Sequence, residues 1–203
     1  DSSALFRTDV TTENYSGTIL KLRIEREVTL LSEKMIASQT GIDINGLNCV
    51  AYRSENTIIN QGDKEWKKET GLLSIWMLGM FNPAPSVVVV VPVKSGDESL
   101  IGPIVNDNYF GKISNDRLKI AGNHIFFKAD GKSRGKIGFP PLRSTGIIGS
   151  YDSDNKILTI LMCKLPEGKN DYVNSAWQLQ ENPYSGDAIN AYNDGPLENG
   201  SQM

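Results

Sequence analysis

Five consecutive valines, Val87 to Val91, constrain the fold of this chain more than any other feature. β-Branched side chains favour extended backbone, and a short run that is apolar at every position is typical of a strand buried on both faces. A strand of that kind lies inside a sheet, with a neighbour on each side. The run therefore predicts a central strand and, around it, a fold with several more strands.

Short segments with strand-like patterns recur along the rest of the chain. From Gly17 to Leu31 apolar residues alternate with charged ones, which is the period of a half-buried strand. A helix also fits, because Leu20, Ile24 and Val28 are spaced by four. We favour the strand, because Gly17 opens it and no helix cap precedes it. The other predicted strands are Leu47–Arg53, Leu72–Leu78, Val87–Val93, Arg117–Ile120, His124–Lys128, Ile147–Tyr151, Ile157–Cys163 and Trp177–Gln180.

Turn-forming residues separate these segments. The separators are Asn82–Pro85, Lys94–Asp97, Ala129–Lys132 and Asp152–Asn155. Asp130 and Gly131 form the strongest hairpin signal, because alternating residues flank them on both sides. Many short strands with few helix signals predict an all-β fold, an antiparallel sandwich or barrel.

Composition limits the classes of protein to which the chain can belong. Its 203 residues, 39% of them hydrophobic, predict one domain with a substantial core. The net charge of -3 provides no general attraction to nucleic acid, so we expect no nucleic-acid partner. No apolar run approaches the roughly 20 residues that a membrane helix needs. Because the sequence starts at Asp1 and stops at Met203 just after a turn-rich tract, we expect it to be incomplete at its C-terminus.

The two cysteines, Cys49 and Cys163, allow either one disulfide or two thiols. Each lies in an apolar, strand-like run. We therefore favour two buried free thiols.

His124 is the single histidine of the chain, which restricts the chemistry that the sequence can support. A metal site with two histidines is excluded, and we expect neither a metal nor another cofactor. No Gly-x-Ser-x-Gly segment supports a serine hydrolase. His124 has two interpretations: a residue packed beside Phe126, or a catalytic acid.

Asn106, Asp107 and Tyr109 combine polar turn formers with an aromatic ring just after the valine run. Aromatic faces cover the C–H surfaces of sugars, and polar neighbours bind their hydroxyls. A turn with side-chain caps explains the same residues. The further candidate aromatic contacts are Trp66, Trp76, Phe110, Tyr151, Trp177 and Tyr192, of which Trp76 is expected to be buried. The polar stretch Glu167–Met203 is interpreted as surface loops, or as loops that rim a pocket.

Lys128, Lys132, Arg134 and Lys136 form the one basic cluster of the sequence. On a strand, the last three share a face. Such a face protects an edge strand from aggregation, or it recognises an acidic ligand whose carboxylate Arg134 binds through two hydrogen bonds.

Three segments carry a resemblance to a known family. They are Trp66 to Asp107, including Gly71-Leu72-Leu73-Ser74-Ile75-Trp76, then Gly131 to Gly138, and Gly149-Ser150-Tyr151-Asp152. Over nearly the whole chain, the sequence resembles a bacterial family of unknown function. That family looks like a branch of the galactose mutarotase-like (aldose 1-epimerase-like) β-supersandwich proteins.

The resemblance implies an antiparallel supersandwich that binds or processes carbohydrate on a concave sheet face, including an aldose mutarotase or epimerase-like activity. It implies His124 as the acid and a base beyond Met203. From the residues themselves, the expected ligand contacts are Asn106, Asp107, Tyr109, Arg134, Tyr151 and Asp152. It also points to an extracytoplasmic protein. The alternative is a non-catalytic carbohydrate-binding or structural module. Oligomeric state and the identity of the sugar stay open.

Overall fold

The computed structural model describes residues 2–168, 170–175 and 180–196. The chain divides into two compact units, Asp1–Leu78 and Gly79–Met203, which are described separately. We call them the N-terminal and C-terminal units. The single domain that the chain length suggests stays a prediction.

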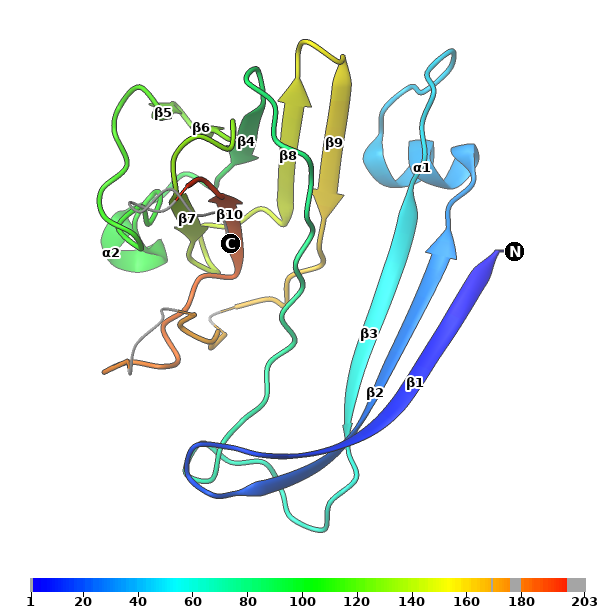
Figure 1. Cartoon of the computed structure of the whole chain (residues 1–203), viewed down its shortest axis with the longest axis vertical. Helices are drawn as coiled ribbons and strands as arrows, with labels where there is room; N and C mark the ends of the chain where they lie inside the picture. Colours follow the sequence, from blue (N-terminus) through cyan, green and yellow to red (C-terminus); the bar gives the residue numbers. More distant parts are fainter. Residues whose placement is uncertain (1, 169, 176–179, 197–203) are drawn as a thin grey trace. The chain divides into compact units, whose positions relative to one another are not determined.

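The N-terminal unit is built on a three-stranded antiparallel sheet in the order β1-β2-β3 (Figure 1). Its strands are β1 (Ser3–Glu13), β2 (Ile19–Leu30) and β3 (Tyr52–Asn60). β2 confirms the strand predicted from alternation, and Leu20 and Leu22 are its buried residues. Cross-strand pairs tie β1 to β2, because Arg7 lies opposite Glu25 at 2.6 Å and Arg23 lies opposite Asp9 at 2.7 Å.

Helix α1 (Glu33–Thr40) joins β2 to β3, where the sequence predicts no helix. Ser32 caps its first turn by accepting from the Met35 backbone N–H, and Gly41 ends it in the left-handed conformation. The strand predicted over Leu47–Arg53 is correct only from Tyr52 onward. The reason is that β2 ends at Leu30, opposite Tyr52, so earlier residues have no strand to pair with.

The C-terminal unit contains a five-stranded antiparallel sheet in the order β5-β6-β4-β8-β9. β4 (Val88–Pro92) is the central strand, as the valine run predicts. The strands around it are β5 (Leu118–Ala121), β6 (His124–Lys128), β8 (Ile147–Asp152) and β9 (Ile157–Met162). Val87 and Val91 of the run are buried and Val88 to Val90 are partly buried, so the predicted burial on both faces is correct only in part. A short helix, α2 (Glu98–Ile101), follows β4.

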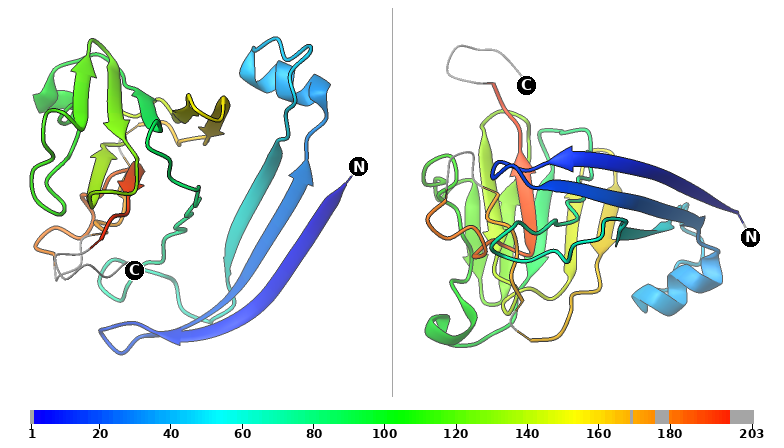
Figure 2. Two further views of the ribbon diagram at one scale, coloured as in Figure 1. Left: turned by 45° about the horizontal axis from the view of Figure 1, so that its top comes forward. Right: turned by 90° about the horizontal axis from the view of Figure 1, so that it is seen from below.

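A second sheet of the same unit pairs β7 (Gly135–Phe139) with β10 (Ile189–Asn193). Figures 1 and 2 show these two strands side by side. The core lies between the two sheets and consists of Val91, Val93, Ile125, Phe127, Ile137, Phe139, Ile189 and Ala191. This packing confirms the predicted all-β, antiparallel, sandwich-like class.

Three expectations about the segments outside the strands are wrong. The segment Leu72–Leu78 forms no strand, and Trp76, expected to be buried, is 72% exposed. Asp130 and Gly131 do not form a hairpin, because β6 and β7 belong to different sheets. Instead, the Asp130 carboxylate accepts from the Arg117 guanidinium, and the Gly131 N–H donates to Asn193 Oδ1 at 2.9 Å. These bonds direct the chain out of one sheet and toward β10.

Both cysteines are free thiols, but Cys49 and Cys163 are exposed, so the expectation of burial is wrong. The strand predicted at Trp177–Gln180 falls mostly outside the described residues, and Trp177 lies wholly outside them. None of the helices in the described part of the chain is long and apolar enough to cross a membrane.

Candidate functional site

The second sheet of the C-terminal unit has one apolar and one polar face. Ile137 and Ile189 face the core, so strand alternation turns Lys136, Asn190 and Tyr192 to the opposite side. Nearby loops add further polar and aromatic residues. We call this surface the β7/β10 polar face, and it consists of Asn106, Tyr109, Arg134, Lys136, Asp187, Asn190 and Tyr192.

Asp187 is the acidic residue of this face, and it lies just before β10. Burial raises the pKa of its carboxyl from 3.8 to about 6, although Asn106 and the charge of Lys136 oppose the shift. Asn106 Nδ2 donates to Asp187 Oδ1 at 2.8 Å. Near neutral pH a fraction of this carboxyl is therefore protonated, and its carboxylate is a stronger base than that of an ordinary surface aspartate.

Gly138 makes room for the Asp187 carboxylate. A Cβ added at Gly138 would overlap Asp187 Oδ2, and Asn190 Oδ1 lies 3.0 Å from the same point. Asn106 flanks Gly138 on the other side through two backbone hydrogen bonds of 2.8 Å. Asn190 Oδ1 is buried and accepts no hydrogen bond from the residues that the structure describes. Two oxygen atoms thus share the space above Gly138.

Lys136 lies against Tyr109. Its Nζ is 3.7 Å from the centre of the Tyr109 ring and donates to Ser175 Oγ at 2.9 Å. The Tyr109 hydroxyl also lies 3.0 Å from Ser175 Oγ. Burial lowers the pKa of Lys136, and the charge of Asp187 opposes this shift. The ammonium is held by a ring and a hydroxyl in a partly desolvated position.

Arg134 contacts two aromatic side chains. Its Nε donates to the Tyr192 hydroxyl at 2.9 Å, and its Cζ is 4.2 Å from the centre of the Phe110 ring. Phe110 in turn meets Tyr192 edge to face, with ring centres 5.7 Å apart. These contacts fix the plane of the guanidinium.

The structure brings three of the seven predicted site residues together on this face: Asn106, Tyr109 and Arg134. Asp107 follows Asn106 in the chain but is not part of the face. Asp107 is buried and accepts from Lys112 Nζ at 2.8 Å. Of the predicted basic face, Lys132 lies in an exposed loop, because β7 begins only at Gly135.

His124 lies elsewhere in the unit, at the exposed start of β6. Its neighbours Ile125 and Phe127 face the core, so His124 projects from the outer face of the five-stranded sheet. The β7/β10 polar face is on the far side of the core. The structure does not bring His124 and Asp187 together, and the acid role of His124 stays a prediction.

Tyr151 and Asp152 also belong to the five-stranded sheet. Tyr151 pairs with Val88 and is exposed. Asp152 closes the β8–β9 turn, because its carboxylate accepts from Asn155 Nδ2 and from Ser86 Oγ, each at 2.7 Å. Bonds from Asn155 and Ser86 lower the pKa of Asp152 to about 2. These contacts are structural, and a ligand role for either residue stays a prediction.

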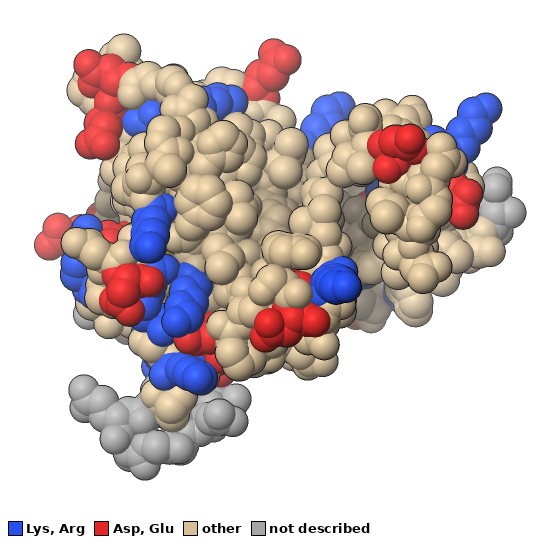
Figure 3. Space-filling view, turned by 90° about the horizontal axis from the view of Figure 1, so that it is seen from above, with Lys and Arg blue, Asp and Glu red and all other residues tan. Residues whose placement is uncertain are grey.

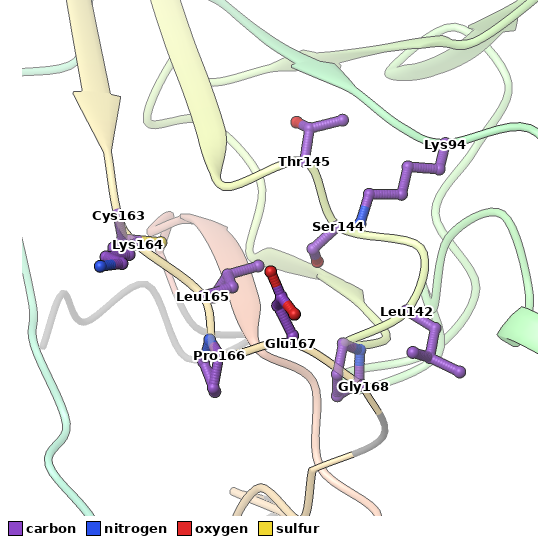
Figure 4. A pocket seen from close by; sticks show the side chains of 11 residues that line it. Lys94, Leu142, Ser144, Thr145, Cys163, Lys164, Leu165, Pro166, Glu167 and Gly168 are labelled. Carbon is purple, nitrogen blue, oxygen red and sulfur yellow. The ribbon is translucent and has the colours of Figure 1, made fainter. Parts of the chain in front are cut away.

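A separate cavity of about 390 Å³ lies between the segments 141–145 and 163–168. Figure 4 shows the side chains of Ser144 and Glu167 pointing toward its middle. None of the described residues that line it is aromatic. It therefore offers no ring on which a sugar could stack.

A metal site is not evident in the residues described: no group of three or more His, Cys, Asp or Glu among them could hold an ion. Asp187 and Asn190 are the site residues that the sequence analysis missed. The alternation of the apolar Ile189 and Ala191 with Asn190 and Tyr192 was the signal for Asn190, and no local pattern marked Asp187.

Comparison with known proteins gives one assignment. One protein family matches residues 1–203, the whole chain. The chain belongs to DUF6786. DUF6786 is a family of unknown function, so the match shows the family of the chain and leaves its activity open. Searches among curated proteins and among solved structures found no similar one. For this DUF6786 member, the function has to be argued from the site itself.

Proposed function

We infer that this protein binds a carbohydrate on the β7/β10 polar face. The observation that carries the proposal is the combination, on one sheet face, of the Tyr109 and Tyr192 rings with the side chains of Asn190, Asp187 and Lys136. Sugar sites need both an aromatic surface for C–H groups and fixed polar groups for hydroxyls. The mutarotase-like resemblance of the sequence supports the same ligand class.

The side chain of Asn190 provides a physical reason why this face would bind a hydroxyl group. A buried carbonyl oxygen without a donor costs about 1–3 kcal/mol. Asn190 Oδ1 is in that state among the described residues, beside the Asp187 carboxylate. A sugar hydroxyl placed above Gly138 would donate to one of these oxygens and recover the cost.

An aldose mutarotase-like activity is the second candidate function, and the raised pKa of Asp187, about 6, favours it. Ring opening needs a base for the anomeric hydroxyl and an acid for the ring oxygen. Asp187 is a carboxylate within this chain that can serve as the base, and Lys136, whose pKa is lowered by burial, is the nearby acid. The rival to both functions is a structural module in which this face binds nothing.

A sugar-binding screen followed by calorimetry tests the first proposal. Tyr192→Leu is expected to weaken the affinity for the selected sugar about tenfold, because it removes one of the two rings of the site. Tyr151→Leu is the matched control, since Tyr151 is an exposed tyrosine of the five-stranded sheet, and it should leave the affinity unchanged. The absence of any sugar ligand, or equal effects of the two variants, would contradict the proposal.

Polarimetry on freshly dissolved glucose and galactose tests the second. Asp187→Asn should remove about 10²-fold or more of any rate above buffer, as loss of a general base does. His124→Ala should retain the rate. Loss of the mutarotation rate in the histidine variant alone would show that His124 is the acid. An extracytoplasmic location, also part of this proposal, is testable by cell fractionation.

A further inference from the structure

Two hydrogen-bond acceptors on the β7/β10 polar face have no donor between them. Asn190 Oδ1 is buried and has no hydrogen-bond partner among the residues that the structure describes. The Asp187 carboxylate is half-buried, and its Oδ1 accepts from Asn106 Nδ2 at 2.8 Å. Its Oδ2 accepts no side-chain hydrogen bond from the described part of the chain. Each of the two oxygens, Asn190 Oδ1 and Asp187 Oδ2, therefore has room for a hydrogen atom that no neighbour supplies.

These two oxygens share one small space. Both lie within 3.0 Å of the point where a Cβ at Gly138 would lie. Asn190 Nδ2 donates to the backbone oxygen of Asp187 at 3.5 Å, and this contact leaves Oδ1 of the amide on the side of the carboxylate. Two acceptors in a poorly hydrated space repel each other. A proton on Asp187 Oδ2 turns that oxygen into a donor for Asn190 Oδ1, so a single proton satisfies both atoms.

The charged groups near Asp187 oppose this proton, so they do not hold it. Lys136, on β7, is the charged side chain that acts on the carboxyl among the described residues, and its ammonium favours the ionised form. The other elements that contact the carboxylate contribute Asn106 and Asn190, neither of which titrates. Basic side chains also gather over part of the C-terminal unit, among a few acidic ones (Figure 3). Burial nevertheless raises the pKa of Asp187 to about 6.

We propose that Asn190 is a positioning residue that accepts the proton of Asp187 and thereby controls when the β7/β10 polar face binds sugar. The inference rests on the proposed carbohydrate function and adds its regulation. With the proton in place, Asp187 Oδ2 donates to Asn190 Oδ1, and neither oxygen is open to a ligand. When the proton leaves to the solvent, both oxygens lack a donor, and a sugar hydroxyl can supply it. The proton and the sugar therefore exclude each other.

A carboxyl-carbon NMR titration of Asp187 tests the shared proton without any ligand. Asn190→Leu fills the same space without an acceptor, so the midpoint of the titration should fall by about one pH unit. Asn106→Leu is the matched control and should raise the midpoint, because Asn106 donates to the ionised form. In the natural chain, the side-chain amide signals of Asn190 should change with the same midpoint as Asp187. An unchanged or raised midpoint in Asn190→Leu, or amide signals that do not follow Asp187, would overturn the inference.

Calorimetry with galactose tests the control of binding. With a midpoint at about pH 6, only about a tenth of the natural chain has lost the proton at pH 5. Its affinity for galactose should therefore be about tenfold lower at pH 5 than at pH 7.5. In Asn190→Leu this loss should occur about one pH unit lower, together with the midpoint of Asp187. Asp187→Asn has no proton to lose and should show the same affinity at both pH values.

The outcomes separate the inference from the proposed function. If galactose binds equally well to the natural chain at both pH values, the control of binding is wrong and the carbohydrate function stands. If the affinity falls at pH 5 but its midpoint does not follow that of Asp187 in Asn190→Leu, another group controls binding and the inference fails. If galactose binds at no pH, the control of binding fails with the proposed function, and the NMR titration still decides whether Asn190 accepts the proton.

Discussion

The Asp187 carboxylate lies where a side chain at position 138 would lie, and Gly138 leaves that space to it. The two residues are 49 positions apart in the sequence. Gly138 lies in β7, and Asp187 lies just before β10, the strand that pairs with β7. The candidate site therefore depends on the absence of a single methyl group.

Gly138→Ala should destabilise the C-terminal unit by about 1–3 kcal/mol, the usual cost of overpacking. The added Cβ would overlap the Asp187 carboxylate and force it to move. Urea denaturation of the variant measures the effect. Gly135→Ala in the same strand is the control, because its Cβ would meet nothing closer than 3.4 Å. In an Asp187→Ala background most of the cost of Gly138→Ala should disappear, and a cost that persists there would show that Asp187 is not the obstacle.

The stability of the chain should fall as the pH rises from about 4 to about 6, through the titration of Asp187. Burial raises its pKa from 3.8 to about 6, so the folded state binds the proton more tightly than the unfolded state over this window. At about 1.4 kcal/mol per pKa unit, the ionised carboxylate costs about 3 kcal/mol above pH 6. Asp187→Asn should therefore be the more stable protein at pH 7.5 and the equal of the natural chain near pH 4. Parallel pH profiles of the two proteins would contradict this.

Loss of the Arg117 side chain should be among the most destabilising changes in the C-terminal unit. Arg117→Met leaves the buried Asp130 carboxylate without its main partner, which typically costs about 3–5 kcal/mol. Lys128→Met is the matched control, because Lys128 is 44% exposed and 3.7 Å from the same carboxylate, and it should cost less than about 1 kcal/mol. Because Arg117 holds the pKa of Asp130 well below its usual range, the stabilisation by Asp130 is present above about pH 4 and is lost on acidification.

Asp152→Ala should lower the melting temperature without changing sugar affinity. The substitution removes the bonds from Ser86 and Asn155 that close the β8–β9 turn. Asp154→Ala, in the same turn, is the control and should change neither quantity. A loss of sugar binding in folded Asp152→Ala would restore the ligand role that the sequence predicts for this residue.

Part of this fold can be predicted from local sequence patterns. Alternation and β-branched residues identify β2, β4, β6, β8 and β9 close to their observed bounds, because a strand that buries one face needs a period of two wherever it lies. The turn at Asp152 is also local, since its carboxylate bonds to residues two and three positions further on. The site residues Asn106, Tyr109 and Arg134 were found for the same reason, as polar and aromatic side chains beside such strands.

Only the tertiary structure decided which strands pair and what their outer faces carry. A period of two says which side chains share a face, but β7 could have paired with β6 through the Asp130-Gly131 turn as well as with β10. The bonds from Arg117 to Asp130 and from Gly131 to Asn193 favour β10. Through that pairing Asn190 lies opposite Gly138, and the loop before β10 places the Asp187 carboxyl over the same glycine. An aspartate has the same local sequence signal whether it is solvated or buried, so its raised pKa was decided by packing alone.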